Sequence, residues 1–160
     1  PVQGVMPKLE VAFADPAWTG LELPPGQQCS LQGGKGQTPS LVVGKVPPEA
    51  NAIIVEFNDA SYAPLSYDGG HGKIGYWVSG SDRVTLASVP GETDHLNVEN
   101  AFVEAPARTT GRYLTPGYLP PCSGGLGNTY TAIVKAVLKP RAQGEVGRLL
   151  AEQSVVIGKY

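Results

Sequence analysis

The sequence has few charged residues, and neither sign of charge is in large excess. Charged residues make up 16% of the 160 positions, and the formal net charge is -2 at pH 7. Proteins that bind nucleic acids carry clustered Lys and Arg side chains, which neutralise phosphates. The 12 Lys and Arg residues of this chain form no such cluster. We therefore expect no nucleic-acid partner.

Long apolar runs are also missing. A membrane-spanning helix requires about 20 consecutive, mainly apolar residues, and no stretch of the sequence approaches that length. The sequence thus predicts no transmembrane segment. It begins with Pro1 rather than Met, which is typical of a processed N-terminus. We expect a periplasmic or secreted location, with a cytoplasmic location as the alternative.

Side chains that hold metals or start catalysis are scarce. The only histidines in the sequence are His71 and His95, and no Cys-x-x-Cys pair is present. A dedicated zinc site is therefore not expected. The Gly-x-Ser-x-Gly motif around the nucleophile of many hydrolases is absent as well. We expect neither a metal nor another cofactor.

The chain has two cysteines, Cys29 and Cys122, which lie far apart in segments rich in Gly and Pro. In an oxidising compartment they can form a disulfide, which would close a long loop and stabilise the fold by a few kcal/mol. In the cytosol they would remain two thiols. The sequence leaves both states open, because pairing requires the two Cα atoms to lie within about 7 Å.

Turn-forming residues are abundant, with 21 Gly and 15 Pro. The apolar content of 41% argues against disorder. Gly and Pro are therefore interpreted as turn and loop residues of a β-rich fold. The length suits a single domain that covers residues 1–160.

Short apolar segments between turn residues predict strands. The segment 52–57 is almost continuously apolar and rich in β-branched residues, as in a strand covered on both faces. The segment 130–138 alternates between two faces and is the clearest strand. Further strands are predicted at 9–12, 41–43, 73–78, 83–88 and 155–157.

One helix is predicted near the C-terminus. Val146, Leu149 and Leu150 have helical spacing within residues 145–153. Many short strands with one late helix predict a mainly β fold, a β-rich α+β sandwich with a C-terminal helix and long loops.

The longest loop covers residues 89–128 and contains only a weak apolar segment at 101–103. Loops of such length are uncommon in compact domains and are often functional.

The first candidate site lies in residues 57–78. A predicted strand ends at Asp59, and the Gly-rich loop that follows carries Asp68 and His71. Histidine titrates near neutral pH, so a nearby carboxylate can make it a general base, and its protonated form can bind an anion. The alternative is a structural turn at 68–70 with His71 as a hydrogen-bonding residue.

Three segments form a longer pattern. The first runs from Cys29 through Gly-Gly at 33–34 to Thr-Pro-Ser-Leu at 38–41 and Val-Pro at 46–47. The second is Asp59 with Pro64 downstream, and the third is Pro-Cys-Ser-Gly-Gly-Leu-Gly-Asn-Thr-Tyr at 121–130. In order and spacing they resemble three motifs of the phosphatidylethanolamine-binding protein (PEBP) family, also called Raf kinase inhibitor-like proteins, in its bacterial branch. The motifs are Cys-Gly...Ser-Pro-x-Leu-x-Trp...Pro, Asp-Pro-Asp-x-Pro and Pro-Cys-Pro-Pro-x-Gly-x-His-Arg-Tyr, and the resemblance covers residues 27–140.

The resemblance implies a β-sandwich with a small pocket for phosphate-like or carboxylate groups at the edge of a sheet. Asp59 matches the first pocket aspartate of the family, Pro121 a proline of the pocket wall, and Tyr130 the tyrosine of the third motif. The pattern is divergent. Ser61 stands near the second aspartate, Gly75 or Tyr76 near one pocket histidine, and Asn128 at the other. His71 is expected to substitute for one of the lost histidines.

The resulting hypothesis is a non-enzymatic PEBP-like protein that binds a small polar or anionic ligand, such as one with a phospho group. In this hypothesis Gly72 and Asn128 donate hydrogen bonds and protonated His71 supplies charge. The predicted ligand-binding residues are Asp59, His71, Gly72, Tyr76, Pro121, Asn128 and Tyr130, with Cys29 and Cys122 as the possible disulfide. Two alternatives remain: a hydrolase or isomerase with Asp59 and His71 as an acid/base pair, and a protein-interaction module, such as a kinase or protease inhibitor, whose contact surface is 89–128.

Overall fold

The computed structural model describes residues 5–144 and 146–160 and consists mainly of strands. The strands are β1 (Glu10–Phe13), β2 (Leu41–Gly44), β3 (Ala52–Asp59), β4 (Lys73–Trp77), β5 (Val84–Leu86), β6 (Ala101–Ala105), β7 (Thr129–Leu138) and β8 (Arg148–Lys159). Three short 3-10 turns accompany them: η1 (Ser30–Gln32), η2 (Ala63–Leu65) and η3 (Gly111–Tyr113). Within the described ranges, no helix is long and apolar enough to cross a membrane.

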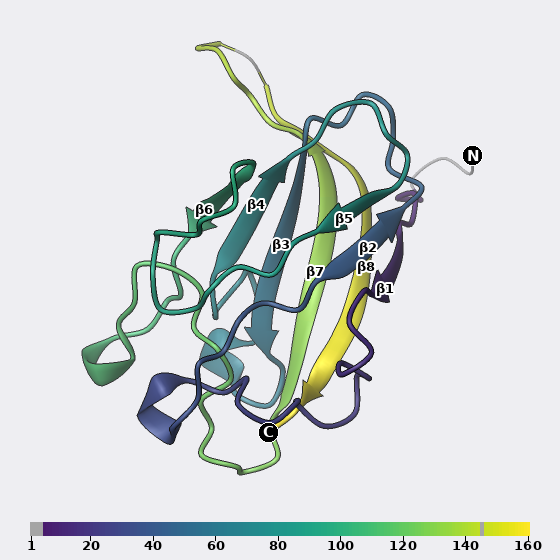
Figure 1. Cartoon of the computed structure of the whole chain (residues 1–160). Helices are drawn as coiled ribbons and strands as arrows, with labels where there is room; N and C mark the ends of the chain where they lie inside the picture. Colours follow the sequence, from purple (N-terminus) through teal and green to yellow (C-terminus); the bar gives the residue numbers. More distant parts are fainter. Residues whose placement is uncertain (1–4, 145) are drawn as a thin grey trace.

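The strands form two sheets that pack face to face (Figure 1). The larger sheet has the order β6-β4-β3-β7-β8, and the smaller sheet has the order β1-β2-β5. All strand pairs in both sheets are antiparallel. The prediction of a mainly β, sandwich-like fold is therefore confirmed.

Strand β3 is the centre of the larger sheet, and every one of its residues is buried. Ile53, Val55 and Phe57 face the smaller sheet and belong to the main hydrophobic core. The alternate residues face outward, and among them Glu56 is only 5% exposed. Its carboxylate lies 3.4 Å from Lys73 Nζ and 3.0 Å from Lys135 Nζ. Two lysines on the neighbouring strands thus compensate the charge of this buried residue.

The predicted C-terminal helix is wrong. Residues 148–159 form the single strand β8, which pairs with β7 along its whole length. Ala136 pairs with Ala151, and the next residue, Val137, pairs with Leu149. Leu150 is therefore an extra, unpaired residue that forms a bulge in β8. This bulge interrupts the alternation of apolar side chains and imitates helical spacing. Glu145, the first residue of the predicted helix, lies outside the described residues.

The long segment 89–128 contains one strand and one short turn. Its weak apolar stretch forms β6, an edge strand that pairs with β4. The remaining backbone packs against the sandwich through buried side chains such as Val89, Leu96 and Tyr118. The segment after β6 folds back toward the end of the larger sheet, where its residues line a pocket.

A second, smaller hydrophobic cluster lies apart from the main core. Its buried members are Cys29, Ala107 and Leu119, with Tyr113 and Cys122 packed against them. We call this group the disulfide cluster, because Cys29 and Cys122 are joined by a disulfide with a Cα–Cα distance of 5.3 Å. It fastens the loop before β2 to the loop before β7.

Two buried tyrosines differ in their hydrogen bonding. Tyr76 donates to the carbonyl oxygen of Ala87 at 2.7 Å. Tyr118 packs on Phe57 with a centroid distance of 4.6 Å, but its hydroxyl has no hydrogen-bond partner among the described residues. An unpaired buried hydroxyl is destabilising, whereas a paired one contributes to stability.

We therefore expect opposite effects from two matched substitutions. Tyr118→Phe should raise the free energy of unfolding by about 1 kcal/mol, and Tyr76→Phe should lower it by about 1 kcal/mol. Urea denaturation of the wild type and both variants measures these changes. Equal losses in the two variants would show that the Tyr118 hydroxyl is paired in solution.

Candidate functional site

A pocket opens at the end of the larger sheet where β3 ends and β4 and β7 begin. These strand ends lie at the lower end of the sheet in Figure 1. Its volume is about 420 Å³. Asp59 and Tyr130 are direct partners in the β3–β7 register, so the sheet itself places them side by side. The wall is completed by loop residues, and the full lining consists of Asp59, Tyr62, Pro64, Leu65, His71, Arg108, Thr109, Thr110, Tyr113, Leu119, Cys122, Ser123, Leu126, Asn128 and Tyr130.

Asp59 is a buried carboxylate with both oxygens engaged. It is only 4% exposed. Oδ1 accepts a hydrogen bond from the backbone N–H of Ser61 at 2.9 Å, and Oδ2 accepts one from Asn128 Nδ2 at 2.8 Å. Each carboxylate oxygen has a second lone pair. Asp59 can therefore accept a further hydrogen bond from a ligand without losing its present partners.

His71 is held in one orientation at the base of the pocket. Its N–H donates to Phe57 O on β3 at 2.9 Å, and its ring lies 5.3 Å from the Tyr130 ring, edge to face. Ring Nδ1 lies 2.7 Å from the carbonyl oxygen of Leu119. Because a carbonyl can only accept, Nδ1 carries the proton, and Nε2 of the neutral ring is an acceptor.

The same burial keeps the ring uncharged. His71 is 3% exposed, and loss of hydration lowers the pKa of the imidazole below its ordinary value. The hydrogen bond to Leu119 and the charge of Asp59 act in the opposite direction but are weaker. This direction of the pKa shift speaks against the predicted role of His71 as a positive charge and favours a neutral ring whose Nε2 is an acceptor.

Arg108 supplies the positive charge instead. Its guanidinium donates to three carbonyl oxygens of the loop after β3, those of Pro64, Tyr67 and Asp68. It also lies 4.7 Å from the centroid of the Tyr67 ring. Among the described residues, it forms no ion pair with a carboxylate. Arg108 is thus a fixed, exposed cation on the pocket wall.

The hydroxyl of Tyr130 links the sheet to the disulfide cluster. It accepts a hydrogen bond from the backbone N–H of Cys122 at 3.2 Å. Burial, together with the charge of Asp59, raises the pKa of Tyr130 to about 12, while Ser123 acts in the opposite direction. The hydroxyl therefore stays protonated.

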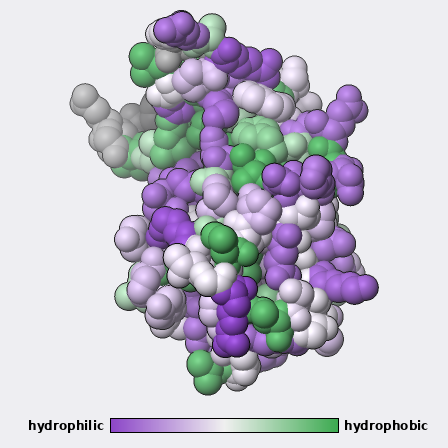
Figure 2. Space-filling view, turned by 90° about the vertical axis from the view of Figure 1, so that its left-hand side faces the viewer, coloured by the Kyte–Doolittle hydropathy of each residue, from purple (hydrophilic) through white to green (hydrophobic). Residues whose placement is uncertain are grey.

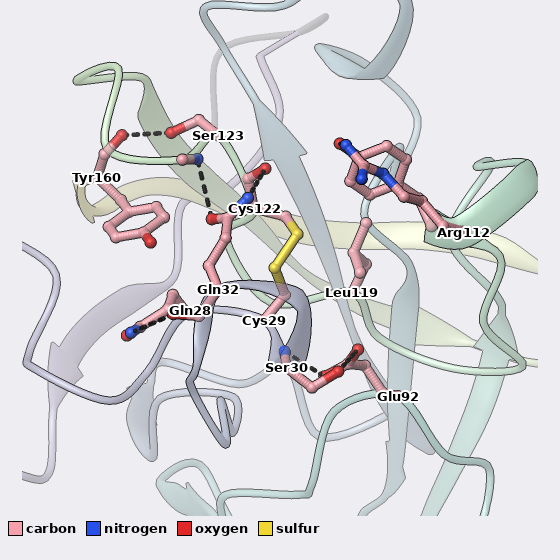
Figure 3. Close-up of a disulfide and its surroundings, with 12 residues drawn as sticks. Gln28, Cys29, Ser30, Gln32, Glu92, Arg112, Leu119, Cys122, Ser123 and Tyr160 are labelled. Atoms are coloured by element: carbon pink, nitrogen blue, oxygen red, sulfur yellow. Dashed lines mark hydrogen bonds between the residues drawn. A yellow bond between two sulfur atoms is a disulfide. The ribbon is translucent and has the colours of Figure 1, made fainter.

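Hydrogen bonds surround the disulfide on both sides (Figure 3). Cys29 N–H donates to Pro121 O at 2.9 Å. The side chain of Gln32 donates to Cys122 O and accepts from Gly124 N–H. On the far side, the Glu92 carboxylate accepts from Ser30 N–H and from its hydroxyl. The loop that carries Cys122 is thus fixed to η1 beside the pocket.

Comparisons with known proteins address the fold. No protein-family model matches the chain, and no curated protein sequence matches it either. A crystal structure from Chlamydia trachomatis, described as a phosphatidylethanolamine-binding protein (PEBP) homolog, matches with a TM-score of 0.50 and 18% identity, over 96% of this chain and 97% of that chain. The chain has a PEBP-like fold. At this low identity it is a divergent example, and the likeness extends to the fold alone.

Four of the residues proposed for the PEBP-like pocket line one cavity: Asp59, His71, Asn128 and Tyr130. These residues lie in the cavity because they are at or near the ends of β3, β4 and β7. The sequence pattern predicted those strand ends to within one or two residues. Asn128 points its amide at Asp59, so its role in the structure is to hold that carboxylate. No group of His, Cys, Asp and Glu suited to a metal ion occurs among the described residues.

Three other proposed residues do not line the cavity. Gly72 N–H is used in a hydrogen bond to Gly69 O at 2.8 Å, so it is no donor for a ligand. Tyr76 lies in the core between the sheets, because it belongs to the inward-facing side of β4. Pro121 offers its carbonyl to Cys29, and its neighbour Cys122 lines the wall in its place.

Sequence reasoning missed the segment that carries Arg108, Thr109 and Thr110. These residues lie within the long segment 89–128 and reach the pocket only because the chain folds back after β6. The backbone N–H of Arg108 donates to the carbonyl oxygen of Gly70 at 2.9 Å. This hydrogen bond holds the segment after β6 against the loop before His71. The only sequence signal was a cation within a polar, Pro-rich stretch.

The buried neutral His71 makes stability depend on pH. Because its folded pKa lies below the ordinary value of 6.5, the unfolded chain binds a proton that the folded chain does not. The free energy of unfolding should therefore fall as the pH drops below 6.5, by up to about 1.4 kcal/mol per pH unit. The depressed pKa of Asp68 acts only below its ordinary value of 3.8.

Urea denaturation between pH 4.5 and 7.5, roughly the range around the histidine pKa, tests this expectation. His71→Gln should flatten the dependence, whereas His95→Gln should leave it unchanged, because the His95 side chain is 91% exposed. The same slope in the wild type and in His71→Gln would contradict the assignment.

Proposed function

We propose that this PEBP-like protein is a non-enzymatic binding protein whose pocket takes a small polar ligand with an anionic group. The observation that carries the proposal is the guanidinium of Arg108, a cation without a carboxylate partner in the described part of the chain, on the wall of a cavity of about 420 Å³. A cavity of this kind with a few polar groups is the usual form of a small-molecule site.

The mouth of the pocket suits the anionic group. Three of the five N–H groups of Arg108 are used by carbonyl oxygens, which leaves two for a ligand. Thr110 is an exposed neighbour with a hydroxyl donor, and it lines the same cavity. A guanidinium and a hydroxyl together suit a phosphate or a carboxylate.

The base of the pocket has the opposite preference. Asp59 and neutral His71 both present acceptors. A bare anion would be repelled there, whereas a hydroxyl, an ammonium group or a protonated phosphate oxygen can donate to them. The ligand class supported by the pocket therefore combines an anionic group at the mouth with a hydrogen-bond donor at the base.

The acid/base alternative has less support. An Asp–His pair for proton transfer needs a direct hydrogen bond between the two side chains, or one bridging water. Here the carboxylate oxygens of Asp59 bond to Ser61 and Asn128, and Nδ1 of His71 bonds to Leu119. Among the described residues no direct hydrogen bond joins the two side chains, which favours binding over catalysis.

The interaction-module alternative concerns the side of the molecule that carries β6. Figure 2 shows this side, and its apolar residues occur in small groups separated by polar ones. Exposed apolar patches larger than a few hundred Å² often mark protein-interaction sites, and this side shows only smaller groups. A small ligand is therefore the better supported partner.

The disulfide is relevant to the cellular location of the protein. Disulfides persist in the periplasm and outside the cell and are rare in the cytosol. The bond between Cys29 and Cys122 therefore supports the periplasmic or secreted location over the cytoplasmic alternative as part of this proposal.

Titration with inorganic phosphate, followed by amide NMR shifts, tests the proposal. We expect saturable shifts at the amides of Arg108, Thr109 and Thr110 in the wild type, because these residues line the mouth where the anionic group is proposed to bind. Arg108→Gln should weaken the affinity about tenfold or more, because a charge-assisted hydrogen bond contributes roughly 1.5–3 kcal/mol. Arg108→Lys should keep part of the affinity.

Arg83→Gln is the matched control, since Arg83 is also exposed but does not line the pocket. Thermal unfolding of each variant separates loss of binding from loss of fold. If phosphate shifts no pocket resonance in the wild type, or if Arg83→Gln weakens binding as much as Arg108→Gln, the proposed site is wrong.

A further inference from the structure

We propose that the Cys29–Cys122 disulfide is a redox switch for the pocket, and that its reduction by a dithiol releases the pocket wall and the hydrogen bond that fixes His71. The inference deepens the proposed function, because ligand affinity is the expected output. Its structural part, the coupling between the disulfide and His71, is measured without any ligand.

The first connection between disulfide and pocket passes through Leu119. This residue is one of the three buried members of the disulfide cluster. It forms two hydrogen bonds with His71: its carbonyl accepts from Nδ1–H at 2.7 Å, and its N–H donates to His71 O at 2.9 Å. The position of Leu119 therefore decides which ring nitrogen of His71 carries the proton.

The second connection passes through Cys122 itself. Its N–H donates to the hydroxyl of Tyr130, which lies beside Asp59 in the sheet register. Cys122 also lines the cavity. A displacement of Cys122 would thus alter the wall of the pocket and remove one hydrogen bond from Tyr130.

The disulfide cluster is small, so the S–S bond is a large part of what holds it together. It buries only Cys29, Ala107 and Leu119, and it is separate from the main core. Segments with few buried apolar contacts open locally at low free energy while the core stays folded. Without the S–S bond, the remaining connections between the two loops are hydrogen bonds such as those of Gln32. Reduction should therefore open this wall and leave the sheets intact.

The two sulfurs differ in access. Cys29 is fully buried, whereas Cys122 is partly exposed and faces the cavity. A thiolate of the dithiol therefore attacks Sγ of Cys122, the S–S bond breaks, and its electron pair leaves on Cys29, which takes up a proton. The second thiolate of the dithiol then attacks the mixed disulfide and releases Cys122 as a thiolate, which is protonated. The dithiol becomes a disulfide, and the protein gains two electrons and two protons.

NMR of the histidine rings tests the coupling directly. In the oxidised protein, ring nitrogen shifts should report protonated Nδ1 for His71. After treatment with dithiothreitol, the His71 shifts should move toward the Nε2–H form, and exchange of the Cys29 and Cys122 amides should accelerate about tenfold or more. The exposed His95 ring is the internal reference and should not change.

A Cys29→Ala/Cys122→Ala double variant should reproduce the reduced spectrum without any reductant. Amides of β3 and β7 serve as the control for the fold. Unchanged His71 shifts after complete reduction would overturn the switch, and so would loss of protection throughout β3 and β7, because the effect would then be global unfolding.

Phosphate titration of both redox forms separates the switch from the proposed function. If the switch acts on the site, the reduced protein should bind phosphate about tenfold more weakly. Equal affinity in both forms overturns the redox inference and leaves the proposed function standing. If neither form binds phosphate but His71 responds to reduction, the proposed function fails while the coupling stands.

Discussion

The pairing of β3 with β4 on one side and β7 on the other is the constraint on which the structure depends. It buries all of β3, and it brings the end of β3 to the beginnings of both neighbours. Asp59, His71 and Tyr130 meet there because they stand at or next to those strand ends. Antiparallel register therefore fixes Asp59 and Tyr130 at the base of the pocket, and the loops around these strand ends supply the rest of the lining.

Burial and exposure divide the pocket into two electrostatic parts. At the base, loss of water favours neutral His71, so that the ring and the Asp59 carboxylate are both acceptors lining the same cavity. At the mouth, the guanidinium of Arg108 is a permanent charge, and hydrogen bonds to three carbonyl oxygens hold it in place. A site with acceptors at its base and a cation at its mouth selects a ligand by where its donor and anionic groups lie. The net charge of a ligand alone therefore does not predict how well it binds.

The strands, the β class and the base of the pocket could be predicted from the sequence because each follows from local patterns. The alternation in β7 and the apolar run in β3 placed Asp59 and Tyr130 at strand ends, and the loop placed His71 nearby. Arg108 could not be found in this way, since its position depends on the return of the chain after β6. The charge of His71 depends on burial, and the β8 bulge at Leu150 depends on pairing with β7, so both needed the folded structure.

Glu56 has a consequence for how the sheet assembles. Its carboxylate belongs on the outer face, between Lys73 and Lys135. If the register of β3 were shifted by one residue, every side chain would move to the opposite face of the sheet. The Glu56 carboxylate would then lie in the hydrophobic core between the sheets without a lysine partner. The apolar run at 52–55 of β3 by itself contains little information about which way the strand should face. Glu56 thus helps to distinguish the correct alignment from its nearest competitor while the chain folds.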